Sequence, residues 1–246
     1  LLKMKGHNSQ CPCHMCAIIG IKAPNNHLYV PLHCPTGTQY DPLNLPLCQH
    51  NMLMAQAHLV KNATNDAEEK QCSQEYRIKG VPLLSTLSLL SIPHSFPYNF
   101  MHLIWENVIK TLILLWAGEH KGIDEGTGDY HLGLTVLEAI RAAGKVSGDT
   151  IPSCFGPQIP GIVKERYYFI ADMRAMGAVW VMALGPILLH QQFKNLVYYI
   201  HFVLLVQLLH LCLQFEISTA DINTIETGMA SWVQEFEKCI LLLINS

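Results

Sequence analysis

The stretch Leu196–Phe215 reads LVYYIHFVLLVQLLHLCLQF and decides whether this chain is a membrane protein. It carries no formal charge over about 20 residues, the length that spans a bilayer as a helix. Gln207, His210 and Gln214 interrupt it at positions i, i+3 and i+7, which places one narrow polar stripe on a helix. No basic cluster or paired aromatic belt flanks it, as a membrane anchor requires. We therefore expect a buried helix of a soluble protein, with a membrane-associated helical protein as the alternative.

The composition of the whole chain is that of a folded domain. Its 246 residues are 50% hydrophobic and 14% charged, whereas soluble domains carry about 25% charged residues. A chain of this length and apolar content can bury most of its surface, which excludes an intrinsically disordered protein. The formal net charge of −3 excludes a strongly basic nucleic-acid-binding tail.

Helical patterns dominate the chain after residue 98. Ser218 with Asp221 three residues later resembles a capping box, and Asn99 and Gly118 mark the two ends of another helix. The apolar period predicts helices at residues 99–117, 135–143, 171–190, 195–216 and 219–239. Residues 144–161 are expected to form a loop rich in glycine and proline. The predicted fold class is therefore mainly α.

Residues 1–48 differ from the rest because they are rich in Cys, His, Pro and Asn and lack a long apolar period. They predict an irregular, zinc-knuckle-like module with one short strand at residues 27–32. Residues 49–78 have a helical pattern, so we expect two domains, a Cys/His-rich module at 1–48 and a helical domain at 49–246. The cysteines of the module are Cys11, Cys13, Cys16, Cys34 and Cys48. The opening residues hold no secretory signal, and the cysteine cluster therefore favours metal binding over disulfides.

Cys13 and Cys16 form a C-x-x-C sequence, in which a tight turn places two thiolates on one side of a zinc ion. His7 or His27 is the expected further ligand of this structural zinc site. Other residues that could complete a tetrahedron are His33, Cys34, Cys48 and His50. One alternative is a redox-active pair, although the βαβ context of a thioredoxin-like protein is absent from the sequence pattern. The other alternative is a pair of idle reduced thiols.

His102 and Glu106 stand four residues apart, so one helix face could present both to a shared metal ion or proton. The alternative is a solvated stripe, on which Glu106 supports Lys110 and His102 lies in the first turn. The sequence holds no phosphate-binding glycine run, G-x-S-x-G or H-E-x-x-H motif. We therefore name no residue that binds an organic cofactor.

Several stretches of the chain together resemble one known family. The longest is Ile78–Trp116, with Phe96–Asn107 at its centre. The others are Lys5–Asn8, Pro12–Cys16, Gly20–Lys22, Gly122–Gly126 and Leu211–Ile217. In these stretches the chain resembles CACTA (En/Spm-like) transposases, particularly copies found in mushroom-forming fungi. The resemblance covers nearly the whole chain, although Gly161–Val181 fits the family poorly.

The resemblance implies a nuclear DNA transposase with an RNase H-like core, in which two aspartates and a glutamate hold Mg²⁺ or Mn²⁺ for strand cleavage and joining. Cys13 and Cys16 match the C-x-x-C of the family. Asn99 and His102 occupy the positions of its Asp-x-x-His motif, with Asn99 in place of the aspartate. The resemblance places the three carboxylates outside this chain, which then corresponds to an internal fragment with the zinc knuckle and the helical insertion.

These matches predict a transposase-derived fragment that is not catalytically competent alone. The partners that the resemblance implies are transposon DNA and further copies of the chain. The degraded motif of Asn99 and His102 supplies the only candidate catalytic residues. The alternative function is a helical protein-interaction or scaffold module with a structural zinc site.

Overall fold

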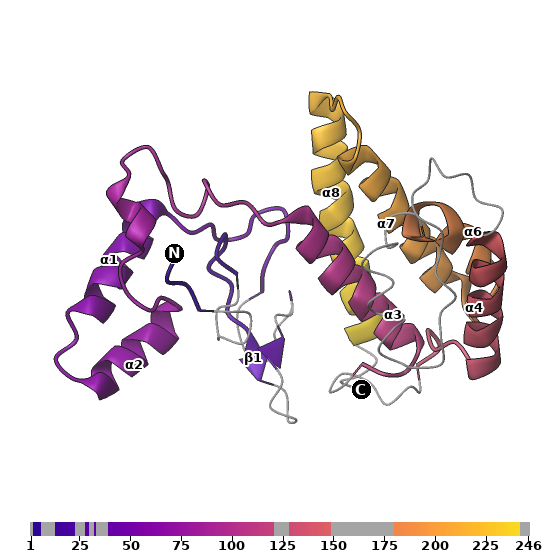
Figure 1. The fold of residues 1–246 in the computed structure, drawn as a ribbon, viewed down its shortest axis with the longest axis horizontal. Coiled ribbons are helices and arrows are strands. Elements are labelled where there is room, and N and C mark those ends of the chain that lie inside the picture. Colours follow the sequence, from indigo (N-terminus) through magenta and orange to yellow (C-terminus); the bar gives the residue numbers. More distant parts are fainter. Residues whose placement is uncertain are drawn as a thin grey trace. The chain divides into compact units, whose positions relative to one another are not determined.

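A computed structural model describes residues 2–5, 13–22, 28–29, 32, 39–120, 128–148 and 180–241 of the chain. The chain divides into two compact units, Leu1–Tyr98 and Asn99–Ser246, and Figure 1 labels their α-helices and strand β1. Within the described residues the protein is mainly helical, which confirms the predicted fold class at that level.

The first unit consists of a helical hairpin and a small core. Its elements are β1 (Ile21–Lys22), β2 (Leu28–Tyr29), α1 (His50–Lys61), α2 (Asp66–Tyr76) and the 3-10 helix η1 (Leu83–Thr86). The strands β1 and β2 form an antiparallel pair, and α1 and α2 pack as a hairpin (Figure 1). The buried core consists of Cys48, Leu53, Ala57, Ile78 and Ile92.

The domain boundary expected between residues 48 and 49 differs from this division, which falls between residues 98 and 99. Cys48 is fully buried in the same core as Leu53 and Ala57 of α1. Ala17, which precedes Cys48 in the sequence, and Phe96, which follows both helices of the hairpin, also pack against that core. Because the Cys/His-rich segment and α1 share one core, a boundary at residue 48 would cut through it.

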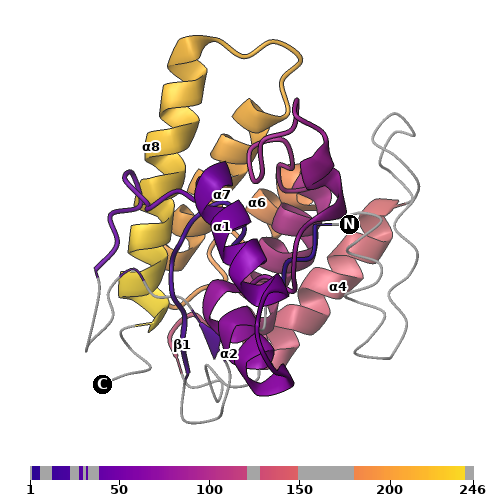
Figure 2. The ribbon, with the colours of Figure 1, turned by 90° about the vertical axis from the view of Figure 1, so that its left-hand side faces the viewer.

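The second unit is a set of helices around one apolar core. Its elements are the π-helix η2 (Met101–Ile109), α3 (Lys110–Trp116), α4 (Leu134–Gly148), the π-helix η4 (Trp180–Leu184), α6 (Gly185–Leu188), α7 (Leu196–Cys212), α8 (Thr219–Phe236) and the π-helix η5 (Glu237–Leu241). The helices α7 and α8 lie side by side in Figures 1 and 2. In the core, Trp116 packs edge-on against Phe193 and Phe202, with ring centroids 5.5 and 5.4 Å apart.

Local signals determine where three helices begin or end. The side chain of Asn195 accepts a hydrogen bond from the N–H of Val197 at the start of α7. Ser218 and Asp221 form the predicted capping box at the start of α8. Gly118 follows α3 with φ of 65°, a left-handed conformation that glycine adopts without a steric penalty. The capping box and the glycine stop were both predicted from the sequence.

Helix α7 confirms the helix predicted at residues 195–216. Its buried side chains are Tyr198, His201, Phe202, Leu205, Val206, Leu208 and Leu209. The stripe of Gln207, His210 and Gln214 is exposed, as the spacing predicted. Among the residues that the structure describes, no helix has the length and apolar content needed to cross a membrane.

Three helices differ from the predicted ranges. Residues 49–78 form two helices because the side chain of Asn65 accepts the N–H of Glu68 and starts α2. Helix α4 continues through Gly148, into the segment expected to be a loop. Of the helix predicted at 171–190, only the part from Trp180 lies in the described residues, where it divides into η4 and α6.

Candidate functional site

The two thiols of the C-x-x-C sequence lie together in the first unit. The turn from Cys13 to Cys16 places both sulfurs on one side of the backbone. The Cys16 thiol donates a hydrogen bond to Sγ of Cys13 at 2.9 Å, and the N–H of Cys16 donates to the same sulfur at 3.2 Å. Cys16 is 5% exposed, whereas Cys13 is only half-buried. The sequence therefore predicted correctly that these two thiols converge.

Tyr98 is the third donor to the Cys13 sulfur. Its hydroxyl lies 3.3 Å from Cys13 Sγ and accepts the backbone N–H of His14 at 3.3 Å. The ring of His14 packs against the Tyr98 ring with centroids 4.3 Å apart, and its Nε2 lies 2.7 Å from the carbonyl oxygen of Phe96. His14 therefore holds the turn against residues 96–98 and does not offer Nε2 to the sulfurs.

Arg77 connects the turn to the third thiol of the cluster, Cys48. Its guanidinium donates hydrogen bonds to the carbonyl oxygens of Cys13 and Cys16, the latter at 2.8 Å, and to Cys48 Sγ at 3.1 Å. Arg77 is 5% exposed and ends α2 with φ of 57°, in the left-handed region. A buried cation that binds two carbonyls and a sulfur positions the turn rigidly.

The hydrogen bonds shift the pKa values of the two thiols of the pair in opposite directions. The bond from the Cys16 thiol, assisted by the Tyr98 hydroxyl, lowers the pKa of Cys13 to about 5 against the opposing effect of burial. Donation of that same bond, together with burial, raises the pKa of Cys16. Burial, and next the bond to Cys13, raise the pKa of Tyr98. In the metal-free chain at neutral pH, Cys13 is therefore the thiolate and Cys16 the thiol.

The pair supplies two thiolate ligands of the type that structural zinc sites use. His7 and His27, the expected further ligands, lie outside the described residues, as do Cys11, His33 and Cys34. His50 has a different partner, because its Nδ1 accepts the N–H of Ile92 at 3.1 Å. In the described parts of the chain, no group of three or more His, Cys, Asp or Glu residues could hold a metal ion. The zinc site stays a prediction.

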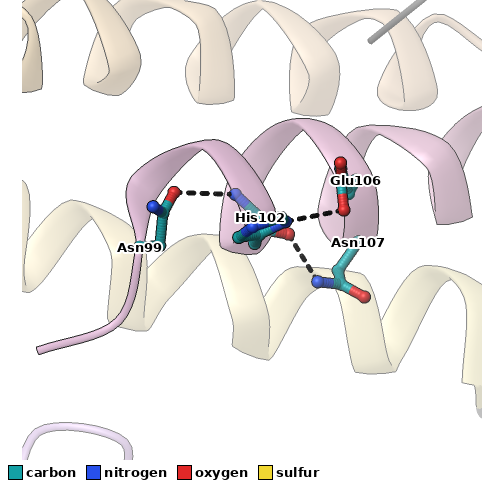
Figure 3. Close-up of polar contacts among 4 residues, drawn as sticks. All are labelled: Asn99, His102, Glu106 and Asn107. Atoms are coloured by element: carbon teal, nitrogen blue, oxygen red, sulfur yellow. Dashed lines mark hydrogen bonds and ion pairs between the residues drawn. The ribbon is translucent and has the colours of Figure 1, made fainter.

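The second predicted cluster lies on η2, at the start of the second unit (Figure 3). The Nδ1 atom of His102 lies 2.7 Å from Oε2 of Glu106, as the i, i+4 spacing predicted. Asn99 Oδ1 accepts the N–H of His102 at 3.2 Å, and the Asn107 amide donates to the carbonyl oxygen of His102. The His102 side chain is 66% exposed, so its contact with Glu106 contributes little to stability. Asn99 thus contacts the backbone of His102 and not its ring.

Sequence reasoning missed Arg77 and Tyr98 as members of the thiol cluster. Both are distant from Cys13 along the chain, and neither stands in a recognisable metal or catalytic motif. Tyr98 does lie in the Phe96–Asn107 stretch that carries the family resemblance, which is the one signal that could have identified it.

Comparisons with known proteins return no match: no family model fits the sequence, and no curated protein or solved structure is significantly similar to it.

Proposed function

We propose that this chain is a transposase-derived fragment that by itself neither cuts nor joins DNA. The resemblance to CACTA transposases carries this proposal, because it places the three metal-holding carboxylates outside this chain, and the side chain at position 99 adds to it. At the position of the aspartate in the family motif, Asn99 offers a neutral amide whose Oδ1 caps the N–H of His102 at 3.2 Å. A capping amide does not supply the negative charge with which carboxylates hold a divalent ion beside a scissile phosphate.

A nicking assay tests this proposal directly. The purified chain is incubated with Mg²⁺ or Mn²⁺ and a duplex that carries a terminal inverted repeat. We expect no nicking above background from the chain or from its His102→Ala variant. Nicking by the original chain that disappears in His102→Ala or Glu106→Ala would overturn the proposal, because it would show a working active site on η2.

We further propose transposon DNA as a partner and the nucleus as the location, both from the resemblance. The net charge of −3 predicts that the chain neutralises few phosphates, so unaided DNA binding is weak and depends steeply on salt. Fluorescence anisotropy with a terminal-repeat duplex at low and physiological salt measures this dependence, with an unrelated duplex as the control. Tight binding at physiological salt would contradict the expectation.

Zinc is the cofactor that we propose for the Cys13–Cys16 pair, in a structural role. The convergence of the two sulfurs supports it, because zinc binds the two deprotonated thiols of a C-x-x-C turn. Metal analysis should find about one zinc per chain, lost in the Cys13→Ser/Cys16→Ser double variant. Cys72→Ser on α2 is the matched control and should retain the metal. A purified chain without zinc would contradict the proposal.

The second candidate function is a helical interaction module, and one observation on α7 favours it. Leu196, Ile200 and Leu204 recur every fourth residue along the helix, and each is 46–55% exposed. The helix carries no charged residue, so its stripe is compatible with the same stripe on a second copy. Light scattering across protein concentrations should show a dimer that Ile200→Glu disrupts and that Ala55→Glu, at an exposed position of α1, leaves intact. A monomer at every concentration would contradict this function.

A further inference from the structure

We propose that, in the metal-free chain, Cys13 and Cys16 form a reversible dithiol–disulfide couple in which Cys13 is attacked first by oxidants and Cys16 resolves the intermediate. The inference concerns the sulfur chemistry of the first unit and does not rest on the proposed transposase function. Its oxidant is a low-molecular-weight disulfide of the glutathione type.

The distance between the sulfurs carries the proposal. They lie 2.9 Å apart and already share a hydrogen bond. A disulfide requires about 2.05 Å, so the pair closes with a movement of about 0.9 Å. The two residues are joined by a turn in which the N–H of Cys16 also donates to Cys13 Sγ at 3.2 Å.

Access distinguishes the roles of the two sulfurs. Cys16 is 5% exposed, so a bulky oxidant cannot approach its sulfur. Cys13 is only half-buried, so it is the more accessible residue of the two. The attacking sulfur of a redox pair must meet the external disulfide, whereas the resolving sulfur needs to reach only its neighbour. Cys13 therefore meets the oxidant, and Cys16 completes the reaction from inside.

The surroundings hold the pair in this arrangement before oxidation. Arg77 donates to the backbone carbonyls of both cysteines, so the turn does not need to form during the reaction. The N–H of Cys16 and the hydroxyl of Tyr98 donate to Cys13 Sγ and stabilise negative charge on it as it attacks. Cys48, the third nearby thiol, is fully buried, and its sulfur accepts a hydrogen bond from the guanidinium of Arg77.

The reaction balances with one molecule of external disulfide. The deprotonated Cys13 sulfur attacks one sulfur of the oxidant, the S–S bond of the oxidant breaks, and one thiolate leaves. The Cys16 thiol then gives its proton to that thiolate or to solvent and attacks Cys13 Sγ. The mixed disulfide breaks and a second thiolate leaves. Cys13 and Cys16 together lose two electrons, and the external disulfide, with one further proton from solvent, is reduced to two thiols.

The test uses the full chain, stripped of metal with a chelator and treated with oxidised glutathione. Intact-mass measurement and peptide mapping should show the loss of two hydrogens and a bond between Cys13 and Cys16, both reversed by dithiothreitol. Cys16→Ser should instead accumulate one glutathionyl group on Cys13, and Cys13→Ser should form neither product at this turn. Cys72→Ser is the matched control and should behave as the original chain.

Three results would overturn the proposal. The first is a pair that stays reduced in the metal-free chain while the reference thiol Cys72 reacts. The second is a bond from Cys13 to Cys11 or Cys48 instead of Cys16. The third is an adduct on Cys16 in the Cys13→Ser variant that forms as fast as the adduct on Cys13 in Cys16→Ser. Zinc content before stripping is a separate measurement, so the zinc proposal and this one fail independently.

Discussion

At the scale of single residues, His201 is the one histidine of the described residues that is buried in the core of the second unit. Its ring stacks on Trp232 with centroids 4.4 Å apart, and Phe236 lies on the same aromatic stack. His201 Nε2 lies 3.0 Å from the carbonyl oxygen of Trp232, while the indole N–H of Trp232 donates to the carbonyl oxygen of His201 at 2.9 Å. This reciprocal pair joins α7 to α8.

Burial lowers the pKa of His201, against smaller opposing effects of the Trp232 carbonyl and the Glu235 carboxylate. At a pH between the pKa of His201 in the folded chain and its higher value in the unfolded chain, the unfolded chain binds more protons. The free energy of unfolding therefore decreases as the pH falls below about 6.5. We expect urea unfolding, followed by tryptophan fluorescence, to show this loss between pH 7 and 5. His201→Phe should weaken the pH dependence, and the exposed His210→Gln should retain it. An unchanged slope in His201→Phe would refute the assignment.

The Cys13 thiol provides a second prediction at this scale. In the metal-free chain, alkylation of Cys13 by iodoacetamide should follow its thiolate fraction, with a midpoint near its pKa of about 5. Tyr98→Phe keeps the ring that packs on His14 but removes the donating hydroxyl, so it should raise the pKa of Cys13 and move the midpoint to higher pH. Tyr40→Phe, which removes another hydroxyl of the first unit, should leave the midpoint in place. A midpoint that does not rise in Tyr98→Phe would contradict the role of the hydroxyl.

These residues also show how far sequence reasoning reaches. The Cys13–Cys16 and His102–Glu106 contacts were predictable because both are local, and backbone geometry alone brings such residues together. Arg77 reaches Cys13 across 64 positions of the chain, and its role depends on the left-handed end of α2 and on the packing of the first unit. Spacing rules contain no information about such contacts.

At the scale of elements, the capping box of α8 offers a stability test. Ser218 Oγ accepts the N–H of Asp221 at 3.1 Å, and Asp221 Oδ2 accepts the N–H of Ser218 at 3.0 Å. Ser218→Ala leaves the first N–H groups of the helix without this acceptor, so it should lower the free energy of unfolding by about 1 kcal/mol. Ser231→Ala, an exposed change later in α8, is the matched control and should have a smaller effect. Chemical denaturation that gives equal values for both variants would contradict the cap.

The ends of helices were more predictable than their continuity. Ser218, Asn99 and Gly118 are side-chain or backbone signals that act within one turn, and the structure uses all three. The π-helical geometry of η2 was not predictable, because its longer hydrogen-bond spacing leaves no distinct residue pattern. The division of residues 49–78 depends on the cap at Asn65, which lies inside a continuous polar stretch and therefore interrupts no apolar period.

At the scale of the whole molecule, the two units carry separate spectroscopic and chemical reporters. All four tryptophans lie in the second unit: Trp105, Trp116, Trp180 and Trp232. Cys48 is fully buried in the core of the first unit. Tryptophan fluorescence therefore follows the unfolding of the second unit, and the reactivity of Cys48 follows the first. Because each unit has its own core, we expect the two units to unfold with different free energies of unfolding.

Core truncations in each unit test whether they unfold separately. Leu53→Ala removes a buried side chain from the first unit and should lower its free energy of unfolding by about 2–5 kcal/mol. The urea midpoint for Cys48 labelling should then fall while the tryptophan midpoint stays constant. Phe202→Ala, in the second unit, should cost about 3–5 kcal/mol and produce the reverse pattern. If either variant lowers both midpoints equally, the chain unfolds as one cooperative body, and the two cores do not act as independent thermodynamic units.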